Sequence, residues 1–355
     1  MKDYKIDSSK GMEIGLYSLG DLLPDVHTGN TIPEQERIQN IIQTAKLAED
    51  AGLDIFSLGE SHQPYFISQA HQVILAYIAA ITSKIKLTSG VTVLSTADPV
   101  RVYEEFSTLD LLSNGRMELI AGRASRTGVY KLMGISLKDY EAIFEEKFEL
   151  LLQLNKERVI NWEGKYRSAL EDAEILPRPL NDKLLIWRGV GGSPASAIKA
   201  GYQGVPMTLA TLAGPASAFK EAIDAYRIVL DNSGFDSNKM PIATTSLCYI
   251  ADDTTTAMRE YFPYMSRGFE LVNGRPFSKY HFAEAKNSKN TLMVGDWELI
   301  VEKILYQHEL YGHQRFLAQV DFGGLPFSKI EKIIDLLANK VAPAVRRETK
   351  RIKLI

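Results

Sequence analysis

Hydrophobic residues along this chain follow two alternating patterns, one typical of helices and one typical of buried strands. In residues 34–52, apolar side chains at positions 38, 41, 42, 45 and 48 recur with a helical period, and Gly52 provides a stop signal. Residues 53–58 (LDIFSL) are almost continuously apolar, which indicates a strand buried on both faces, as in a parallel sheet. The same succession repeats along most of the chain.

This repetition predicts about eight strand–helix pairs. The expected strands cover residues 12–19, 53–58, 85–94, 116–121, 183–190, 204–209, 242–250 and 314–319. The expected helices cover residues 34–52, 70–82, 99–113, 138–156, 195–201, 214–232, 254–268, 296–311 and 329–345. Alternating strands and helices favour a parallel sheet. Their number favours a closed barrel over an open doubly wound sheet, so the predicted fold class is α/β, a (β/α)8 TIM barrel with insertions.

Three segments depart from the repeat. Residues 1–11 are polar and are expected to form an N-terminal tail, and residues 161–179 are rich in turn residues and are expected to form a small hairpin. Residues 269–292 show no period and carry many polar groups, so they are a candidate for a mobile lid over the barrel mouth. An insertion without a function is the alternative. No second core-sized shift in composition is visible, and residues 1–355 are predicted to form one domain.

Composition narrows the class of protein. Of 355 residues, 45% are hydrophobic and 24% charged, as in ordinary globular proteins, and the net charge of -3 gives no general attraction to nucleic acid or anionic membranes. The one cysteine, Cys248, excludes an intramolecular disulfide and fits a reducing compartment. The first residues lack the apolar segment of a secretory signal, and no apolar run reaches the roughly 18 residues of a membrane helix. We expect a cytoplasmic protein that binds neither nucleic acid nor membrane.

In a barrel of this kind, function belongs at the carboxyl ends of the strands. Glu60, Ser61 and His62 follow the strand predicted at 53–58, and Arg123 follows the strand at 116–121. Gly90 interrupts the β-branched strand at 85–94, where a glycine marks either a bulge or a place where a ligand approaches the backbone.

The turn after the strand at 183–190 has the composition of a phosphate site. It reads GGSPAS, residues 191–196, and its free N–H groups and two hydroxyls could hold a phosphate at the start of a helix. An ordinary helix N-cap is the alternative. Arg123 could grip a phosphate with two hydrogen bonds, although it could equally be a surface arginine paired with an acid, and Arg126 competes for the role. The third glycine of a dinucleotide-binding motif is missing, so a Rossmann fold is disfavoured.

The histidines do not suggest a metal site. His308 and His313 are five residues apart and so lie on different faces of a helix, and no HExxH motif occurs. His62 and His71 lie on either side of a loop and lack a neighbouring third ligand.

Several segments together resemble the bacterial luciferase-like, flavin-dependent monooxygenases. The most specific is SGVTVLSTADPVRVYEEFSTLDLLSNGRMELIAGR, residues 89–123. LDIFSLGESH is similar to the family's strand that ends in Glu-His-His, and KLLIWRGVGGSPASAIKAG is similar to its phosphate turn. The likeness runs from about Met12 to Arg347 and is weakest at 262–292.

The resemblance implies a luciferase-like barrel that binds a flavin, usually FMN. It places Gly90 and Val91 under the isoalloxazine ring, where many members have a non-prolyl cis peptide, and Glu60 as the acid near the flavin. It assigns the phosphate to a set of side chains and backbone N–H groups, namely those of Arg123, Gly191, Gly192, Ser193 and Ser196.

One position departs from the family pattern. Where the luciferases have Glu-His-His this chain has Glu60-Ser61-His62, and serine is a poor base without an activating partner. Either His62 takes the acid–base role, or the chemistry needs no imidazole at position 61, or activity is reduced; we prefer the second. Tyr65 and Phe66 are candidates for the substrate pocket, with simple packing as the alternative.

The resulting hypothesis is a two-component monooxygenase. It would use reduced FMN from a separate flavin reductase, together with dioxygen, to oxidise a small organic substrate, because no dinucleotide-binding module is visible. The resemblance also suggests a homodimer or a higher homo-oligomer. The alternatives are a deazaflavin-dependent hydride transferase on the same barrel and a non-catalytic flavin-binding protein.

Overall fold

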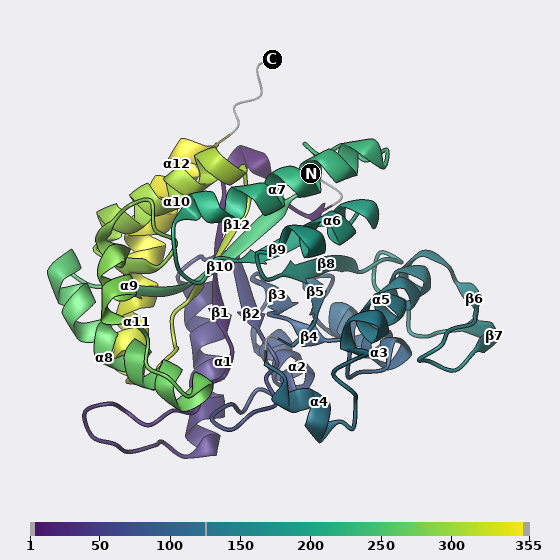
Figure 1. Cartoon of the computed structure of the whole chain (residues 1–355), viewed down its shortest axis with the longest axis horizontal. Helices are drawn as coiled ribbons and strands as arrows, with labels where there is room; N and C mark the ends of the chain where they lie inside the picture. Colours follow the sequence, from purple (N-terminus) through teal and green to yellow (C-terminus); the bar gives the residue numbers. More distant parts are fainter. Residues whose placement is uncertain (1–3, 125, 351–355) are drawn as a thin grey trace.

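The computed structural model describes residues 4–124 and 126–350, and its centre is a closed barrel of parallel strands (Figure 1). The strands follow one another around the barrel in this order: β1 (Glu13–Ser18), β2 (Ile55–Leu58), β3 (Lys86–Ser89), β5 (Met117–Gly122), β8 (Leu185–Val190), β9 (Met207–Ala210), β10 (Ile242–Ile250) and β12 (Arg315–Gln319). The last strand pairs with the first, Glu13 lying opposite Arg315. The predicted (β/α)8 barrel is therefore confirmed.

Helices surround the barrel and bury their apolar stripes against it (Figure 1). They are α1 (Glu34–Asp50), α2 (His71–Ile81), α3 (Pro99–Leu112), α5 (Tyr140–Lys156), α6 (Pro194–Tyr202), α7 (Lys220–Asn232), α8 (Thr254–Asn273), α10 (Trp297–Tyr311), α11 (Phe327–Leu336) and α12 (Ala342–Thr349). The last two were predicted as one helix, and a π-helical turn, Leu337–Val341, joins them. Local signals fix several ends: the Asp98 carboxylate accepts a hydrogen bond from Val100 N–H at the start of α3.

Short elements account for the remaining differences from the predicted pattern. The strand expected at 85–94 is broken after Ser89, and its continuation β4 (Thr92–Val93) pairs with β5. The predicted hairpin is present as the antiparallel strands β6 (Val159–Trp162) and β7 (Leu170–Glu174), at one side of the barrel (Figure 1). Short elements that the sequence pattern missed include α4 (Gly128–Leu132), β11 (Met293–Gly295) and the 3-10 turn Ser8–Lys10. The helix predicted at 214–232 is present as a 3-10 turn, Ala216–Phe219, followed by α7.

Residues 269–292 contain more regular structure than the sequence pattern indicates. Helix α8 continues to Asn273, and α9 (Lys279–Ala283) and a 3-10 turn (Glu284–Lys286) follow it. Phe282 is 3% exposed and belongs to the main core. Helices of one or two turns are too short to display a hydrophobic period, which explains the difference. Movement of this segment as a lid stays a prediction.

The amino end of the barrel is filled by an apolar cluster that includes a residue of the expected tail, and by a buried ionic cluster. Ile6 is 4% exposed and packs in one cluster with Ile120 and Trp187, while residues 1–3 lie outside the described part of the chain. The Arg315 guanidinium donates to Glu118 at 2.6 Å and to Glu13 at 2.8 Å. The amino end is thus packed and charge-paired. This leaves the carboxyl end as the open face.

Among the described residues, no helix is long and apolar enough to cross a bilayer.

Candidate active site

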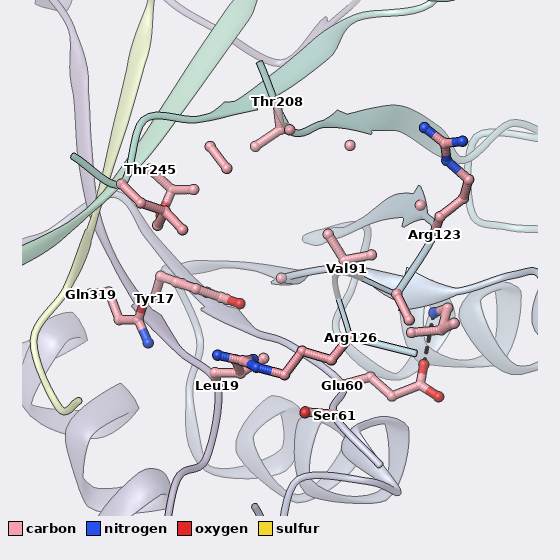
Figure 2. A pocket seen from close by; sticks show the side chains of 18 of the residues that line it. Tyr17, Leu19, Glu60, Ser61, Val91, Arg123, Arg126, Thr208, Thr245 and Gln319 are labelled. Atoms are coloured by element: carbon pink, nitrogen blue, oxygen red, sulfur yellow. Dashed lines mark hydrogen bonds between the residues drawn. The ribbon is translucent and has the colours of Figure 1, made fainter. Parts of the chain in front are cut away.

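A cavity opens at the carboxyl ends of the barrel strands, and most of the predicted site residues meet there (Figure 2). The predicted residues that line it are Glu60, Ser61, His62, Gly90, Val91, Arg123 and Gly191. Its wall is largely apolar, with side chains such as Val93, Val190, Leu247, Phe269 and Phe322. Such a combination of an apolar wall and a few converging polar groups is typical of a small-molecule site.

Glu60 and His62 form a hydrogen-bonded pair in this wall. The loop after β2 brings His62 Nε2 to within 2.5 Å of Glu60 Oε1, and the side chains are 12% and 9% exposed. Glu60 Oε2 accepts a second hydrogen bond from Val93 N–H at 2.8 Å, so the carboxylate is fixed to the adjoining strand β4. A carboxylate held in this way fixes the orientation of the imidazole.

Burial and hydrogen bonds act in opposite directions on the Glu60 carboxyl. Burial raises its pKa, but the hydrogen bonds from His62 and Val93 act in the other direction, and the pKa lies below its ordinary value. Glu60 is therefore ionised at neutral pH. Burial lowers the pKa of His71 to about 4, which leaves that ring neutral.

His71 is a contact of the site that sequence reasoning did not assign. It is the first residue of α2 and is fully buried, with Nδ1 3.8 Å from Glu60 Oε2 and Nε2 3.0 Å from Thr92 Oγ1. No local motif links residues 60, 71 and 92, so only the packing of α2 against β3 and β4 reveals this contact.

Ser61 lies between the two paired residues in sequence but takes no part in their hydrogen bond. It is 8% exposed and lines the cavity, and Figure 2 shows its hydroxyl directed into the space below Arg126. Among the described residues, the Ser61 hydroxyl has no hydrogen-bond partner, so nothing activates it as a base.

Glycines at the base of the cavity allow close packing that a Cβ would prevent. Val91 packs over Gly122 and Gly189, where an added Cβ would approach its methyl carbons to 2.8 and 3.2 Å. A Cβ at Gly90 would lie 2.2 Å from the Tyr17 ring and 2.7 Å from Gly59 N. Gly90 therefore allows β1, β2 and β3 to pack closely at the mouth.

The expected cis peptide at Gly90–Val91 is wrong for this structure. The cis bond of the described chain is Leu176–Pro177, an ordinary prolyl type. Tyr17 and Gly59 pack closely against Gly90 although the peptide bonds before and after Gly90 are both trans.

Of the predicted phosphate residues, Arg123 and Gly191 line the cavity, whereas Gly192, Ser193 and Ser196 follow Gly191 in the turn and first helical turn of α6 and are not among the described lining residues. Gly192 has a φ of +96°, and the Ser193 hydroxyl makes no capping hydrogen bond to α6. Ser196 is 6% exposed on the first turn of α6. The Arg123 guanidinium is 3.2 Å from the Glu141 carboxylate. This ion pair is partly exposed and therefore weak, so a phosphate could take the place of Glu141 beside Arg123.

Tyr65 and Phe66 are not among the described residues that line this cavity. They border a separate hollow on the outer side of the loop after β2, which shares His62 and Gln63 with the main cavity. Phe66 is 3% exposed and packs under the Arg126 guanidinium at 5.2 Å, which favours the packing alternative for this residue.

Other lining residues were missed because they come from strand ends with no motif. Tyr17 on β1 and Gln319 on β12 lie side by side, where the first and last strands pair to close the barrel. Thr208 and Thr245 lie on β9 and β10 (Figure 2). The available signal was their position near the carboxyl end of predicted strands. Arg126, considered only as a rival of Arg123, also lines the cavity.

Within the described residues, no group of three or more His, Cys, Asp or Glu side chains is arranged to hold a metal ion.

Comparison with known sequences gives consistent matches. Residues 12–314 match the family described as luciferase-like monooxygenase. The chain is 28% identical over 271 residues to a luciferase-like monooxygenase of Escherichia coli strain K12, covering 71% of this chain and 73% of that protein. It is 30% identical over 197 residues to the N-acetyl-S-alkylcysteine monooxygenase of Bacillus subtilis, covering 54% and 56%.

Solved structures share the fold at lower identity. The monooxygenase RslO1 from Streptomyces bottropensis superposes with a TM-score of 0.83 at 22% identity, over 94% of this chain and 99% of that one. The oxygenating constituent of 3,6-diketocamphane monooxygenase from Pseudomonas putida, in complex with FMN, gives 0.74 at 20% over 94% and 98%. An F420-dependent secondary alcohol dehydrogenase gives 0.72 at 18% over 94% and 99%. The matched sequence, the closed barrel and the cavity at its mouth agree, and the chain belongs to the luciferase-like monooxygenase family.

Proposed function

We propose that this protein is an FMN-dependent monooxygenase that oxidises a small organic substrate with dioxygen and receives reduced FMN from a separate reductase. The supporting observation is that one cavity combines a cationic, glycine-lined end, a thin apolar floor and the Glu60–His62 pair. Phosphate, flavin ring and acid–base chemistry each need one of these features.

The residues present fit FMN. Arg123 and the start of α6 would hold the phosphate, since the Ser193 side chain does not cap the helix and Gly192 has no Cβ. Val91, supported by Gly122 and Gly189, would form the wall against the ring. When bound and reduced, FMN would supply the electrons with which dioxygen delivers one oxygen atom to the substrate and releases the other as water.

His62 would be the proton-transferring group of the site. Glu60 holds the imidazole at 2.5 Å and stays ionised, whereas the Ser61 hydroxyl has no activating partner among the described residues. This favours the first of the three explanations for serine at position 61 over the one preferred from the sequence. The apolar side chains Phe269 and Phe322 would help to exclude water from the reacting groups.

Substitutions at positions 61 and 62 distinguish the roles of Ser61 and His62 in proton transfer. His62→Gln is expected to lower the turnover rate by roughly 100-fold or more, the usual range for loss of a general acid–base. Ser61→Ala is expected to lower it by less than about three-fold, because the hydroxyl carries no proton-transfer role. Turnover is measured as product formed under excess reduced FMN, with the affinity for oxidised FMN as the control for folding. A larger loss in Ser61→Ala would assign the chemistry to position 61.

Cofactor selection tests the function as a whole. Tight binding of FMN, with one atom of 18O2 incorporated into a product from a panel of aldehydes, thioethers, sulfonates and amines, is the expected result. Selective binding of deazaflavin without oxygen consumption would instead indicate hydride transfer. FMN that binds tightly but, once reduced, is oxidised no faster than in buffer and yields no product would indicate a non-catalytic flavin-binding protein.

Self-association would be part of the proposed working form. Helix α2 exposes an apolar row one helical turn apart, with Val73 70%, Tyr77 54% and Ile81 38% exposed, and Leu112 on the neighbouring α3 is 62% exposed. A second copy of the chain could cover this face around a two-fold axis. Tyr77→Glu is expected to shift the protein from dimer to monomer in light scattering at micromolar concentration, and an unchanged mass would place the interface elsewhere.

A further inference from the structure

We infer that Arg126 binds a carboxylate of the substrate, so that the compound oxidised in this cavity is an organic acid. The inference rests on the proposed function in that it treats the cavity as a substrate site. It concerns a residue that neither the phosphate end nor the Glu60–His62 pair uses.

Arg126 points into the cavity away from the phosphate end. Figure 2 shows its guanidinium extended toward Leu19 and Tyr17, while the side chain of Arg123, three residues earlier, diverges from it toward another part of the cavity. The loop after β5 thus supplies a cation to each end of one cavity. Because the two cations diverge, one phosphate group is not expected to contact both.

The contacts of Arg126 within the protein do not neutralise it. Its Nε donates to Asn273 Oδ1 at 3.3 Å, and its guanidinium lies 5.2 Å from the centre of the Phe66 ring. Among the described residues, no carboxylate oxygen lies within the 4.0 Å of an ion pair. Neutral partners fix the direction of the side chain but leave its charge available.

Arg126 is partly buried, and it differs from the three buried arginines of the described chain. The carboxylate partners of Arg37, Arg188 and Arg315 lie at 2.6, 2.7 and 2.6 Å. An unpaired charge in a partly desolvated position is unfavourable, which is why buried cations normally have such partners. Burial lowers the pKa of Arg126, opposed by Tyr17 and Asp21, yet a guanidinium remains protonated at neutral pH.

The surroundings of Arg126 suit a planar two-oxygen anion. Burial raises the pKa of Tyr17, so its hydroxyl stays protonated and can donate, and the Gln319 amide lines the same side of the cavity. A guanidinium fork matches the spacing of two carboxylate oxygens. The rest of such a molecule would extend over the apolar floor at Val91 toward the Glu60–His62 pair.

The test compares acids with their neutral amides. On FMN-loaded protein, titration calorimetry measures the affinities of hexanoate against hexanamide and of 4-phenylbutanoate against 4-phenylbutanamide. Wild type is expected to bind at least one acid about ten-fold or more tightly than its amide, as for a charge-assisted hydrogen bond. Arg126→Gln is expected to abolish the difference, and Arg126→Lys to retain part of it. Arg101→Gln, an exposed arginine on α3, is the matched control and is expected to leave the preference unchanged.

Each contrary outcome is distinct. Equal affinity for acid and amide in wild type, or a preference that persists in Arg126→Gln, would overturn the inference. Weakened FMN binding in Arg126→Gln with an unchanged preference would assign the residue to the cofactor instead. The same titrations without FMN separate the two proposals: an acid preference in a protein that fails to bind FMN would keep the inference and reject the proposed function.

Discussion

Replacing Arg123 by alanine is expected to raise the dissociation constant for oxidised FMN by about 10- to 100-fold, while that for riboflavin stays nearly unchanged. The reason is that a hydrogen bond to a charged group contributes roughly 1.5–3 kcal/mol, and riboflavin lacks the phosphate that would receive it. Quenching of flavin fluorescence measures both constants. An equal loss for both flavins would mean that Arg123 supports the ring or the fold rather than the phosphate.

Replacing Glu141 is expected to change the affinity for FMN in the opposite direction. Its carboxylate is 3.2 Å from the Arg123 guanidinium, where it competes with an incoming phosphate. Glu141→Gln is therefore expected to tighten FMN binding by a few-fold, again without an effect on riboflavin. Opposite shifts from two variants that are each expected to fold would locate the phosphate more firmly than a single loss. Weaker FMN binding in Glu141→Gln would contradict this arrangement.

Replacing Arg315 by methionine is expected to lower the free energy of unfolding by about 3–5 kcal/mol, the usual cost of breaking a buried ion pair. The Glu118 carboxylate is fully buried and would lose both hydrogen bonds from the guanidinium, at 2.6 and 3.0 Å. Urea denaturation measures the loss. Arg347→Met, which removes an exposed pair with Glu348, is the control and is expected to change stability by less than about 0.5 kcal/mol. A similar small change in Arg315→Met would show that the cluster is not needed for stability.

The pH dependence of this loss follows from Glu118. Burial raises its pKa, but Arg315 outweighs burial and holds the pKa below its ordinary value. The carboxylate therefore stabilises the fold above the unfolded pKa of about 4.3, and this contribution is lost as the pH falls through the lower folded pKa. In Arg315→Met the same carboxyl is buried without its partner, so its protonation relieves the destabilisation. Without Arg315, burial leaves the folded-state pKa of Glu118 above the unfolded value, so the difference in stability between wild type and variant is expected to narrow as the pH falls from neutral toward about 4. Adding Glu118→Leu to Arg315→Met is expected to restore much of the stability.

Most of the fold could be predicted because it is encoded in local patterns. The alternation of apolar strands and amphipathic helices predicted the closed barrel, and it placed residues 60–62, 123 and 191 at the face where the cavity opens. The exceptions are short elements such as α4, α9 and β11, in which too few residues occur to show a period. The break at Gly90 depends on contacts with β1 and β2, which are distant in sequence.

The sequence predicted those site residues that directly follow a strand, but not the others that line the cavity. Residues 65 and 66, next to the correct loop, border a different hollow, because the chain turns outward there with a φ of +72° at Tyr65. Tyr17 and Gln319 are neighbours because β12 pairs with β1, that is, because the last strand of the barrel pairs with the first.

The sequence by itself determined the barrel, its functional face and the candidate phosphate turn, since each depends on neighbouring residues along the chain. Tertiary structure alone decided which side chains work together. It pairs Glu60 with His62 rather than with Ser61, and it turns Arg126 away from Arg123. The physical reason is that the direction of a side chain is set by what packs around it, and at this barrel mouth those neighbours come from strands and helices far apart in sequence.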